Sequence, residues 1–250
     1  MSVHEPNGLA ADHTPAAIAA RIAADPKQAY LRDFIYGSID GLVTTFAIVT
    51  GALGAGLSTS IIVVLGFVNL LADGFSMAVS NFLGTKADRQ MVERARLIEE
   101  RHVDEIPDGE AEEVHEIYRR KGFEGDLLDR IVQVITGDRQ LWIETMLREE
   151  WGLALHGPSP RKAALVTMGS FVFVGLIPVL PFLVFTNAGG DRGHFAISAA
   201  STAIAFFGVG ALKSQSTPGP WYRAGLETLL MGGAAAVLAW IVGAALRGFV

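Results

Sequence analysis

Five apolar stretches, each close to the length of a membrane-spanning helix, constrain this chain more than any other feature. The sequence has 250 residues and a positive mean hydropathy. The stretches run over residues 34–56, 59–82, 163–185, 194–212 and 225–246. Crossing the hydrocarbon core takes about 20 mostly apolar residues in a helix. The sequence therefore predicts an all-α membrane protein with five transmembrane helices.

Charge is concentrated between the second and third stretches. Residues 84–162 hold 13 of the 20 Lys and Arg and 18 of the 26 Asp and Glu. We therefore expect four parts. They are an N-terminal cytoplasmic tail over 1–32, transmembrane helices over 33–83, an acidic helical metal-binding domain over 84–162, and transmembrane helices over 163–250.

The distribution of Lys and Arg predicts the orientation, because cytoplasmic loops retain positive charge. The 84–162 segment holds most of that charge, whereas the turn at 57–58 has no basic residue. The N-terminus and the insert should therefore be cytoplasmic and the C-terminus outside. The first residues lack the pattern of a cleavable signal peptide. No organelle-targeting signal is visible either, so a bacterial inner membrane is the default expectation.

Composition narrows the possible ligands and partners. The chain has no Cys, which excludes disulfides, thiolate zinc sites and iron–sulfur clusters. The net charge of −6 without a basic stripe argues against nucleic acid as a partner. Any bound metal ion must be held by oxygen, nitrogen or thioether ligands.

Gly and Pro residues mark the breaks between helices. Within the insert they predict a small bundle of four helices over 84–105, 110–121, 124–136 and 138–155. In the third apolar stretch, Pro178 and Pro181 interrupt the backbone hydrogen bonding. A neighbouring helix or water must then satisfy the freed backbone groups.

Two carboxylates lie inside predicted spans, Asp40 in the first and Asp73 in the second. A charge at that depth costs at least ~2.5–3.5 kcal/mol, so such residues usually face a pathway. Asp73, Met77 and Asn81 follow at i, i+4 and i+8, which places them on one helix face as a possible cation ladder. The alternative is that Asp73 and Asn81 only hydrogen-bond to neighbouring helices while Met77 fills space.

Clusters of carboxylates in the insert are the second candidate site. Glu99 and His102, and Glu112 and His115, both have Glu-x-x-His spacing, which puts two ligands on one side of a helix. A third cluster contains Met146. A solvated helix face is the commoner explanation for one such cluster, and a Met beside Trp142 is more often core. A mixed oxygen, nitrogen and thioether set would favour iron(II), manganese or cobalt over magnesium or calcium.

The sequence resembles the vacuolar iron transporter family from Asp33 nearly to its end. The resemblance is carried by Asp40-Gly41, by Gly74-Phe75-Ser76-Met77, by the run from Met146 to Glu150, and by the Pro-containing third span. It implies a homodimer with the pathway between two copies of the first helix, and export of ferrous ion from the cytoplasm in exchange for protons.

The resemblance also implies ligands. Asp40 and Met77 match intramembrane metal ligands, and further matches in the cytoplasmic domain are Glu105, Glu113, Glu116, Met146 and Glu150. His102 stands where the family usually has Glu, and we include it among the metal ligands. Leu147 replaces a second Met, Asp73 replaces a small residue, and Asn81 lies in a segment that differs from the family.

We therefore expect a transporter, not an enzyme, that exports Fe²⁺ or Mn²⁺ by proton antiport. The pathway residues would be Asp40, Asp73, Met77 and Asn81, with no permanent cofactor. The spacing of Gly37 and Gly41 would let two copies of the first helix approach, although packing within one chain explains it equally well. The alternative functions are a membrane-anchored iron sensor or a di-iron ferroxidase-like enzyme, and a purely structural membrane protein.

Overall fold

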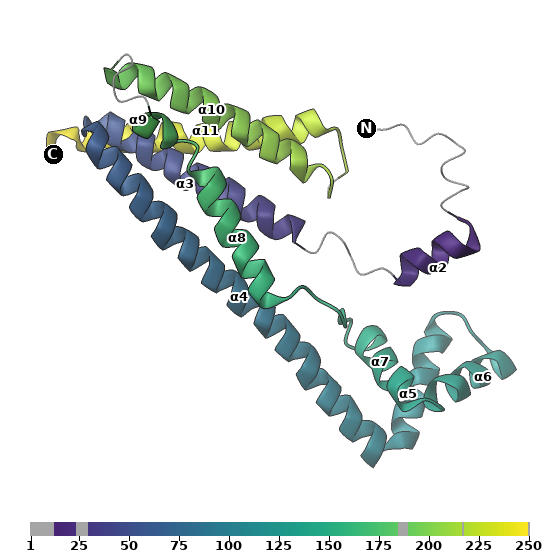
Figure 1. The fold of residues 1–250 in the computed structure, drawn as a ribbon. Coiled ribbons are helices and arrows are strands. Elements are labelled where there is room, and N and C mark those ends of the chain that lie inside the picture. Colours follow the sequence, from purple (N-terminus) through teal and green to yellow (C-terminus); the bar gives the residue numbers. More distant parts are fainter. Residues whose placement is uncertain (1–12, 24–29, 185–189, 217, 250) are drawn as a thin grey trace. The chain divides into compact units, whose positions relative to one another are not determined.

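The computed structural model describes residues 13–23, 30–184, 190–216 and 218–249, and all regular structure in these ranges is helical (Figure 1). The chain divides into two compact units, one of residues 1–81 and 161–250 and one of residues 82–160. The helices of the first unit are α2 (Pro15–Ala23), α3 (Leu31–Ala55), α8 (Pro160–Gly175), α9 (Leu180–Val184), α10 (Gly190–Lys213) and α11 (Trp221–Leu246), followed by the short 3₁₀ helix η1 (Arg247–Phe249). Those of the second are α5 (Pro107–Arg120), α6 (Gly125–Thr136) and α7 (Arg139–Glu149), and α4 (Thr59–Glu105) contributes residues to both units.

In the described part of the chain, four helices are long and apolar enough to cross a membrane: Leu31–Ala55, Thr59–Glu105, Gly193–Lys213 and Trp221–Phe249. These contain most or all of four of the predicted spans. The fifth, at 163–185, is divided between α8 and α9 by a turn over 176–179. The all-helical class and several membrane helices are thus confirmed, while the count of five and the cytoplasmic location of the insert stay predictions.

The break between α8 and α9 follows from its prolines. Pro178 and Pro181 have no backbone N–H, so the helix cannot continue through this stretch. The Ser198 hydroxyl on α10 donates a buried hydrogen bond of 2.6 Å to the carbonyl oxygen of Pro178. The expectation that a neighbouring helix satisfies the freed backbone is therefore confirmed at this carbonyl.

Glycines on α3 let neighbouring backbones approach it closely. A Cβ at Gly37 or Gly41 would collide with backbone oxygens of α8, those of Thr167 and Phe171 respectively. Further along α3, a Cβ at Gly54 would lie 2.5 Å from the carbonyl oxygen of Trp240 on α11. Of the two explanations for the Gly37 and Gly41 spacing, the structure shows packing within one chain.

Two small apolar clusters hold the second unit together. One joins α5, α6 and α7 through Val114, Ile135, Trp142 and Met146, and the other joins α4 and α7. Helix α5 begins at Pro107, three residues before the predicted start, because Pro is favoured in the first turn of a helix. Helix α7 ends at Glu149, six residues before the predicted end at 155.

We expect Gly41→Ala to destabilise the protein, because the added methyl group must displace the backbone of Phe171. Overpacking of this kind costs about 1–3 kcal/mol, more than the helix propensity that Ala gains over Gly. The measurement is the apparent thermal midpoint of the purified protein in detergent. Gly169→Ala on α8 is the matched control, since nothing lies within 4 Å of its added Cβ. Equal midpoints for the two variants would contradict the close approach.

Candidate functional site

The second unit buries two carboxylates close to each other. The chain reverses between the end of α4 at Glu105 and the start of α5 at Pro107, and this brings Glu110 to Glu99 and His102. Glu99 is 1% exposed and Glu110 is 0% exposed. The Nδ1 atom of His102 lies 3.0 Å from Oε1 of Glu110, and one ligand atom of each of the three residues lies within 4.8 Å of the others. That geometry can hold a metal ion.

The hydrogen bonding of these two carboxylates is incomplete. The indole N–H of Trp151 donates to Oε1 of Glu99 at 2.8 Å. Oε2 of Glu99 and both oxygens of Glu110 are buried without a hydrogen-bond donor. A buried carboxylate is costly unless a cation or several donors compensate it. The arrangement therefore favours a bound cation or a bound proton.

The raised pKa values of the Glu110 and Glu150 carboxyl groups indicate that both interact with neighbouring negative charges. Burial, followed by the negative charges of Glu99 and Glu113, raises the pKa of Glu110 from 4.5 to about 7. The Glu150 carboxyl has a raised pKa through desolvation and then through the same two charges. Four carboxyl groups with His102 thus form one electrostatic cluster, which we call the acidic cluster: Glu99, Glu110, Glu113 and Glu150 with His102.

The predicted ligands of the insert fall into three groups. His102, Glu113 and Glu150 belong to the acidic cluster. Met146 is fully buried in the apolar core beside Trp142. Glu105 is exposed at the end of α4, and Glu116 is paired with arginines.

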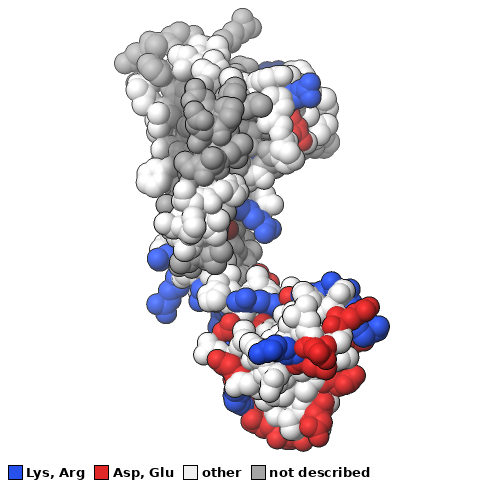
Figure 2. All heavy atoms as spheres, turned by 90° about the vertical axis from the view of Figure 1, so that its right-hand side faces the viewer, with Lys and Arg blue, Asp and Glu red and all other residues white. Residues whose placement is uncertain are grey.

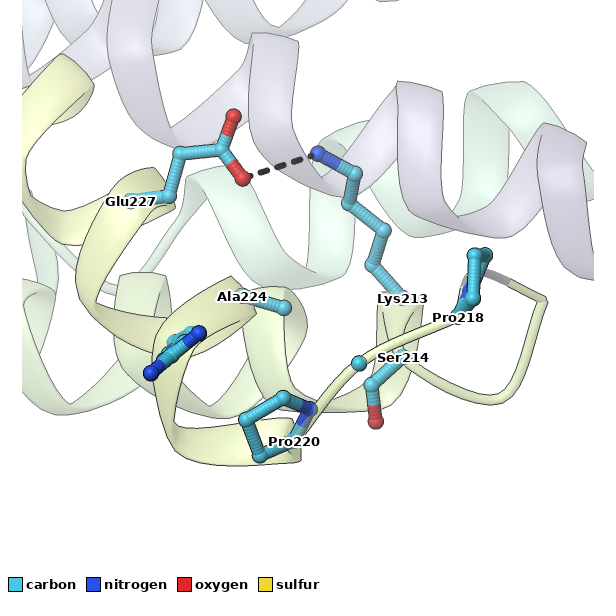
Figure 3. A pocket seen from close by; sticks show the side chains of 8 residues that line it. Lys213, Ser214, Pro218, Pro220, Ala224 and Glu227 are labelled. Carbon is cyan, nitrogen blue, oxygen red and sulfur yellow. Dashed lines mark ion pairs between the residues drawn. The ribbon is translucent and has the colours of Figure 1, made fainter.

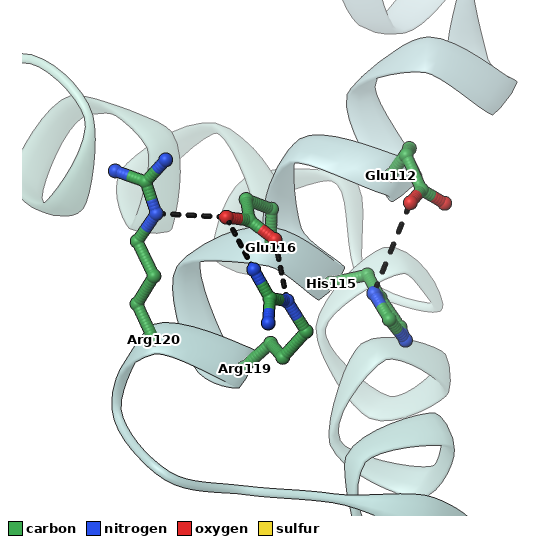
Figure 4. A network of polar contacts seen from close by, with 5 residues as sticks. All are labelled: Glu112, His115, Glu116, Arg119 and Arg120. Carbon is green, nitrogen blue, oxygen red and sulfur yellow. Dashed lines mark hydrogen bonds and ion pairs between the residues drawn. The ribbon is translucent and has the colours of Figure 1, made fainter.

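Figure 4 shows how Glu116 is held. Its carboxylate accepts hydrogen bonds from Arg119 at 2.7 Å and Arg120 at 2.8 Å, which lower its pKa to about 2. In the same view His115 turns to Glu112, 3.9 Å away. Within the described residues, the group that could hold a metal ion contains Glu99 and His102 but neither Glu112 nor His115. The two Glu-x-x-His pairs therefore do not form one di-iron centre here.

Sequence reasoning missed Glu110 and did not select Glu99. Glu99 had a signal, because it opens a Glu-x-x-His pair. Glu110 had no such signal, since the sequence of the second unit contains many acidic residues, and many of them lie on its surface (Figure 2). Its burial depends on the reversal between α4 and α5, which brings it against another helix.

The membrane helices carry the other candidate residues. Asp40 on α3 and Asp73 on α4 are half-buried, and their carboxylates are close enough for their charges to repel. Met77, one turn after Asp73, is half-buried as well. Asn69 on α4 donates to the hydroxyl oxygens of Thr44 and Thr45, which ties α4 to α3 beside Asp40. A carboxylate pair with a thioether one turn away is a set that can bind a divalent ion.

Asn81 hydrogen-bonds to neighbouring helices, as expected from the alternative to a cation ladder. Its side-chain amide donates to Oδ1 of Asp33 at 2.9 Å and to the Thr167 hydroxyl at 2.6 Å. It therefore links α4 to both α3 and α8. The other carboxylate oxygen of Asp33 is buried without a hydrogen-bond donor.

A hollow between the end of α10 and the start of α11 does not contain the predicted residues. Figure 3 shows Lys213 reaching across it to Glu227, with a nitrogen-to-oxygen distance of 3.6 Å. Pro218, Pro220 and Ala224 form much of its wall. With its one lining carboxylate paired to a lysine, the hollow does not offer a cation site.

The raised pKa of Glu110 predicts a pH-dependent stability of the metal-free protein. Below pH 4.5 the folded and unfolded forms both carry the proton, and as the pH rises to about 7 the unfolded form ionises first, so folding loses stability. Gln mimics the protonated group. We expect Glu110→Gln to change the thermal midpoint little at pH 4.5 and to raise it at pH 8, measured with a chelator present.

Glu116→Gln is the control of opposite sign. The arginine pairs lower the Glu116 pKa, so any stability they add is present above pH 4.5 and is lost as the pH falls. This variant should not gain stability at pH 8. A rise for Glu110→Gln that is equal at both pH values would contradict the assignment of a buried, ionised carboxylate.

Comparisons with known proteins show the family of this chain. A profile described as the VIT family matches residues 31–244. The chain is 31% identical to a vacuolar iron transporter of Plasmodium berghei (strain Anka), with 87% of this chain and 82% of the relative aligned. It is 32% identical to that of Centaurea cyanus (84% and 85% aligned) and 30% identical to vacuolar iron transporter 1 of Arabidopsis thaliana (84% and 83% aligned). Because the profile and these alignments extend over most of the chain, this protein belongs to the VIT family.

Proposed function

We propose that this multi-pass membrane protein exports ferrous iron, and manganese with it, from the cytoplasm in exchange for protons. The observation that carries the proposal is the pair of buried carboxylates, Glu99 and Glu110, beside the imidazole of His102. Oxygen and nitrogen ligands together suit Fe²⁺ and Mn²⁺ better than Mg²⁺ or Ca²⁺. The names of the aligned relatives support iron as the transported ion.

The acidic cluster would collect the ion on the cytoplasmic side. We propose Glu99, His102 and Glu110 as its central ligands, with Glu113 and Glu150 adding negative charge around them. Of the ligands expected from the sequence, this set keeps His102 as a ligand and Glu113 and Glu150 as surrounding charge. It replaces Glu105 and Glu116 with Glu99 and Glu110. Met146 would supply its thioether only if the core around it rearranges, because it is fully buried there.

Asp40, Asp73 and Met77 would receive the ion within the membrane. A carboxylate cannot hold a proton and a divalent cation at the same time, so competition at this pair provides a route to exchange. Asn81 would act by fixing Asp33 and the three helices that it links. In a homodimer, the contact would have to use exposed residues of α3 such as Tyr36, because Gly37 and Gly41 already pack against α8.

Ligand substitutions test the revised metal site. We expect Glu99→Gln and Glu110→Gln each to weaken Mn²⁺ binding by about tenfold or more, since each removes a charged ligand from a buried site. Glu105→Gln and Glu116→Gln are matched controls on the same two helices and should leave the affinity nearly unchanged. Isothermal titration calorimetry of the full-length protein in detergent measures both. Weakening by the control pair alone would favour the ligand set expected from the sequence.

Ion flux tests the transport function. In proteoliposomes with an imposed pH gradient, Fe²⁺ and Mn²⁺ uptake should depend on the gradient and should fall to background in Asp40→Asn, because the amide carries no titratable proton and no charge to bind the ion. Asp88→Asn, the same change at an exposed position, should transport normally. Metal binding without flux in the unsubstituted protein would point to a sensor, and oxygen consumption with Fe²⁺ would point to a ferroxidase.

A further inference from the structure

Trp151 makes an unusual contact for a residue outside the apolar cores. It follows α7 and remains 42% exposed, yet its indole N–H donates at 2.8 Å to a carboxylate that is 1% exposed. Trp142, on α7, shows the opposite arrangement, with a buried ring whose N–H has no acceptor. The position of Trp151 therefore serves mainly its hydrogen bond, not the burial of its apolar ring.

The hydrogen bond uses one of the two oxygens of Glu99. Oε1 accepts from Trp151, whereas Oε2 is buried without a donor and remains open to a ligand. A donor at one oxygen competes with a metal ion for the lone pairs of that oxygen, so it favours metal binding through the other oxygen. A fixed partner of this kind also limits rotation of the carboxylate and so organises the site before the ion arrives.

We propose that Trp151 is a positioning residue that holds Glu99 as a single-oxygen ligand and thereby favours a small transition-metal ion over Ca²⁺. This inference rests on the proposed function of the acidic cluster. Ca²⁺ takes six to eight oxygen ligands and often binds a carboxylate through both oxygens. Mn²⁺ and Fe²⁺ need fewer oxygens and accept the imidazole of His102. Freeing Oε1 of Glu99 would therefore help Ca²⁺ and would loosen the site for the smaller ions.

The test compares Mn²⁺ and Ca²⁺ affinities of the full-length protein by titration calorimetry. Trp151→Phe keeps an aromatic ring but removes the N–H donor. We expect its Mn²⁺ affinity to fall by about tenfold, as is typical when a residue that orients a metal ligand is lost, while its Ca²⁺ affinity stays the same or rises. A general disturbance of the unit would weaken both ions. Equal weakening of Mn²⁺ and Ca²⁺ therefore overturns the proposal.

Trp142→Phe is the matched control, because it makes the same chemical change in the same unit at an N–H without an acceptor. It should keep the Mn²⁺ to Ca²⁺ preference of the unsubstituted protein. Trp151→His restores a ring N–H and should bind Mn²⁺ more tightly than Trp151→Phe. If Trp151→Phe does not fold by circular dichroism, the His variant and the measurement below decide the question.

A double substitution separates this inference from the proposed function. If Trp151 acts through Glu99, adding Trp151→Phe to Glu99→Gln should cause no further loss of Mn²⁺ affinity. If Glu99→Gln weakens Mn²⁺ binding but Trp151→Phe does not, the metal site stands and the role of Trp151 is wrong. If Glu99→Gln has no effect, the proposed site itself is wrong, and the inference falls with it.

A measurement without a Trp151 variant gives a second check. With Trp142, Trp221 and Trp240 each replaced by Phe, Trp151 is the one tryptophan left. Saturating Mn²⁺ should then change the tryptophan emission, since the Trp151 indole is hydrogen-bonded to a ligand of the paramagnetic ion. The change should disappear in the same background with Glu99→Gln. Emission that Mn²⁺ leaves unaltered, under conditions where calorimetry shows binding, overturns the proposal.

Discussion

The close approach of neighbouring backbones to α3 is the constraint on which the membrane unit depends. Gly37 and Gly41 leave no room for a side chain against α8, and Gly54 leaves none against α11. Asp40 lies on the same helix and is only half-buried, beside Asp73 of α4. Because backbones in contact at glycines have little freedom to slide, the position of Asp40 is set by packing that involves no charge. Hydrogen bonds from Asn69 to Thr44 and Thr45 tie α4, and with it Asp73, to α3.

The second unit meets a different constraint, which is electrostatic. Burying two neighbouring carboxylates without enough donors opposes folding. A proton on Glu110 relieves this cost, and burial accordingly raises the pKa of Glu110 to about 7. A divalent cation would relieve it more fully. Metal binding to carboxylates that hold a proton releases that proton, and the proposed exchange of a metal ion for protons would require this coupling.

Both candidate sites bring carboxylates close together, but different contacts hold the helices that carry these carboxylates. In the membrane unit the carboxylates belong to long apolar helices held by glycine contacts and by hydrogen bonds such as that of Asn81 to Asp33 and Thr167. In the second unit they belong to helices held by two small apolar clusters. In this second site Trp151 also donates a hydrogen bond to Glu99.

The sequence alone predicts the all-helical class, four of the membrane helices, the carboxylates within apolar helices and the family. These follow from hydropathy, from the rarity of charge in apolar helices and from short motifs around Asp40 and Met77, all of which are local in the chain. Pro178 and Pro181 likewise predicted interrupted backbone hydrogen bonding in the third span. The hydrogen bond from Ser198 to the carbonyl oxygen of Pro178 could not be predicted from the sequence.

Which acidic residues of the insert come together depends on how its helices pack. Glu99 and Glu110 are buried, whereas Glu105 is exposed and Glu116 is paired with Arg119 and Arg120. These four residues look alike in the sequence. The spacing of an acidic residue indicates which face of its helix it lies on, but not which other helix packs against that face. The reversal at Pro107 and the packing of α5 select the buried pair. The burial of this pair, and with it the raised pKa of Glu110, is a property of helices in contact.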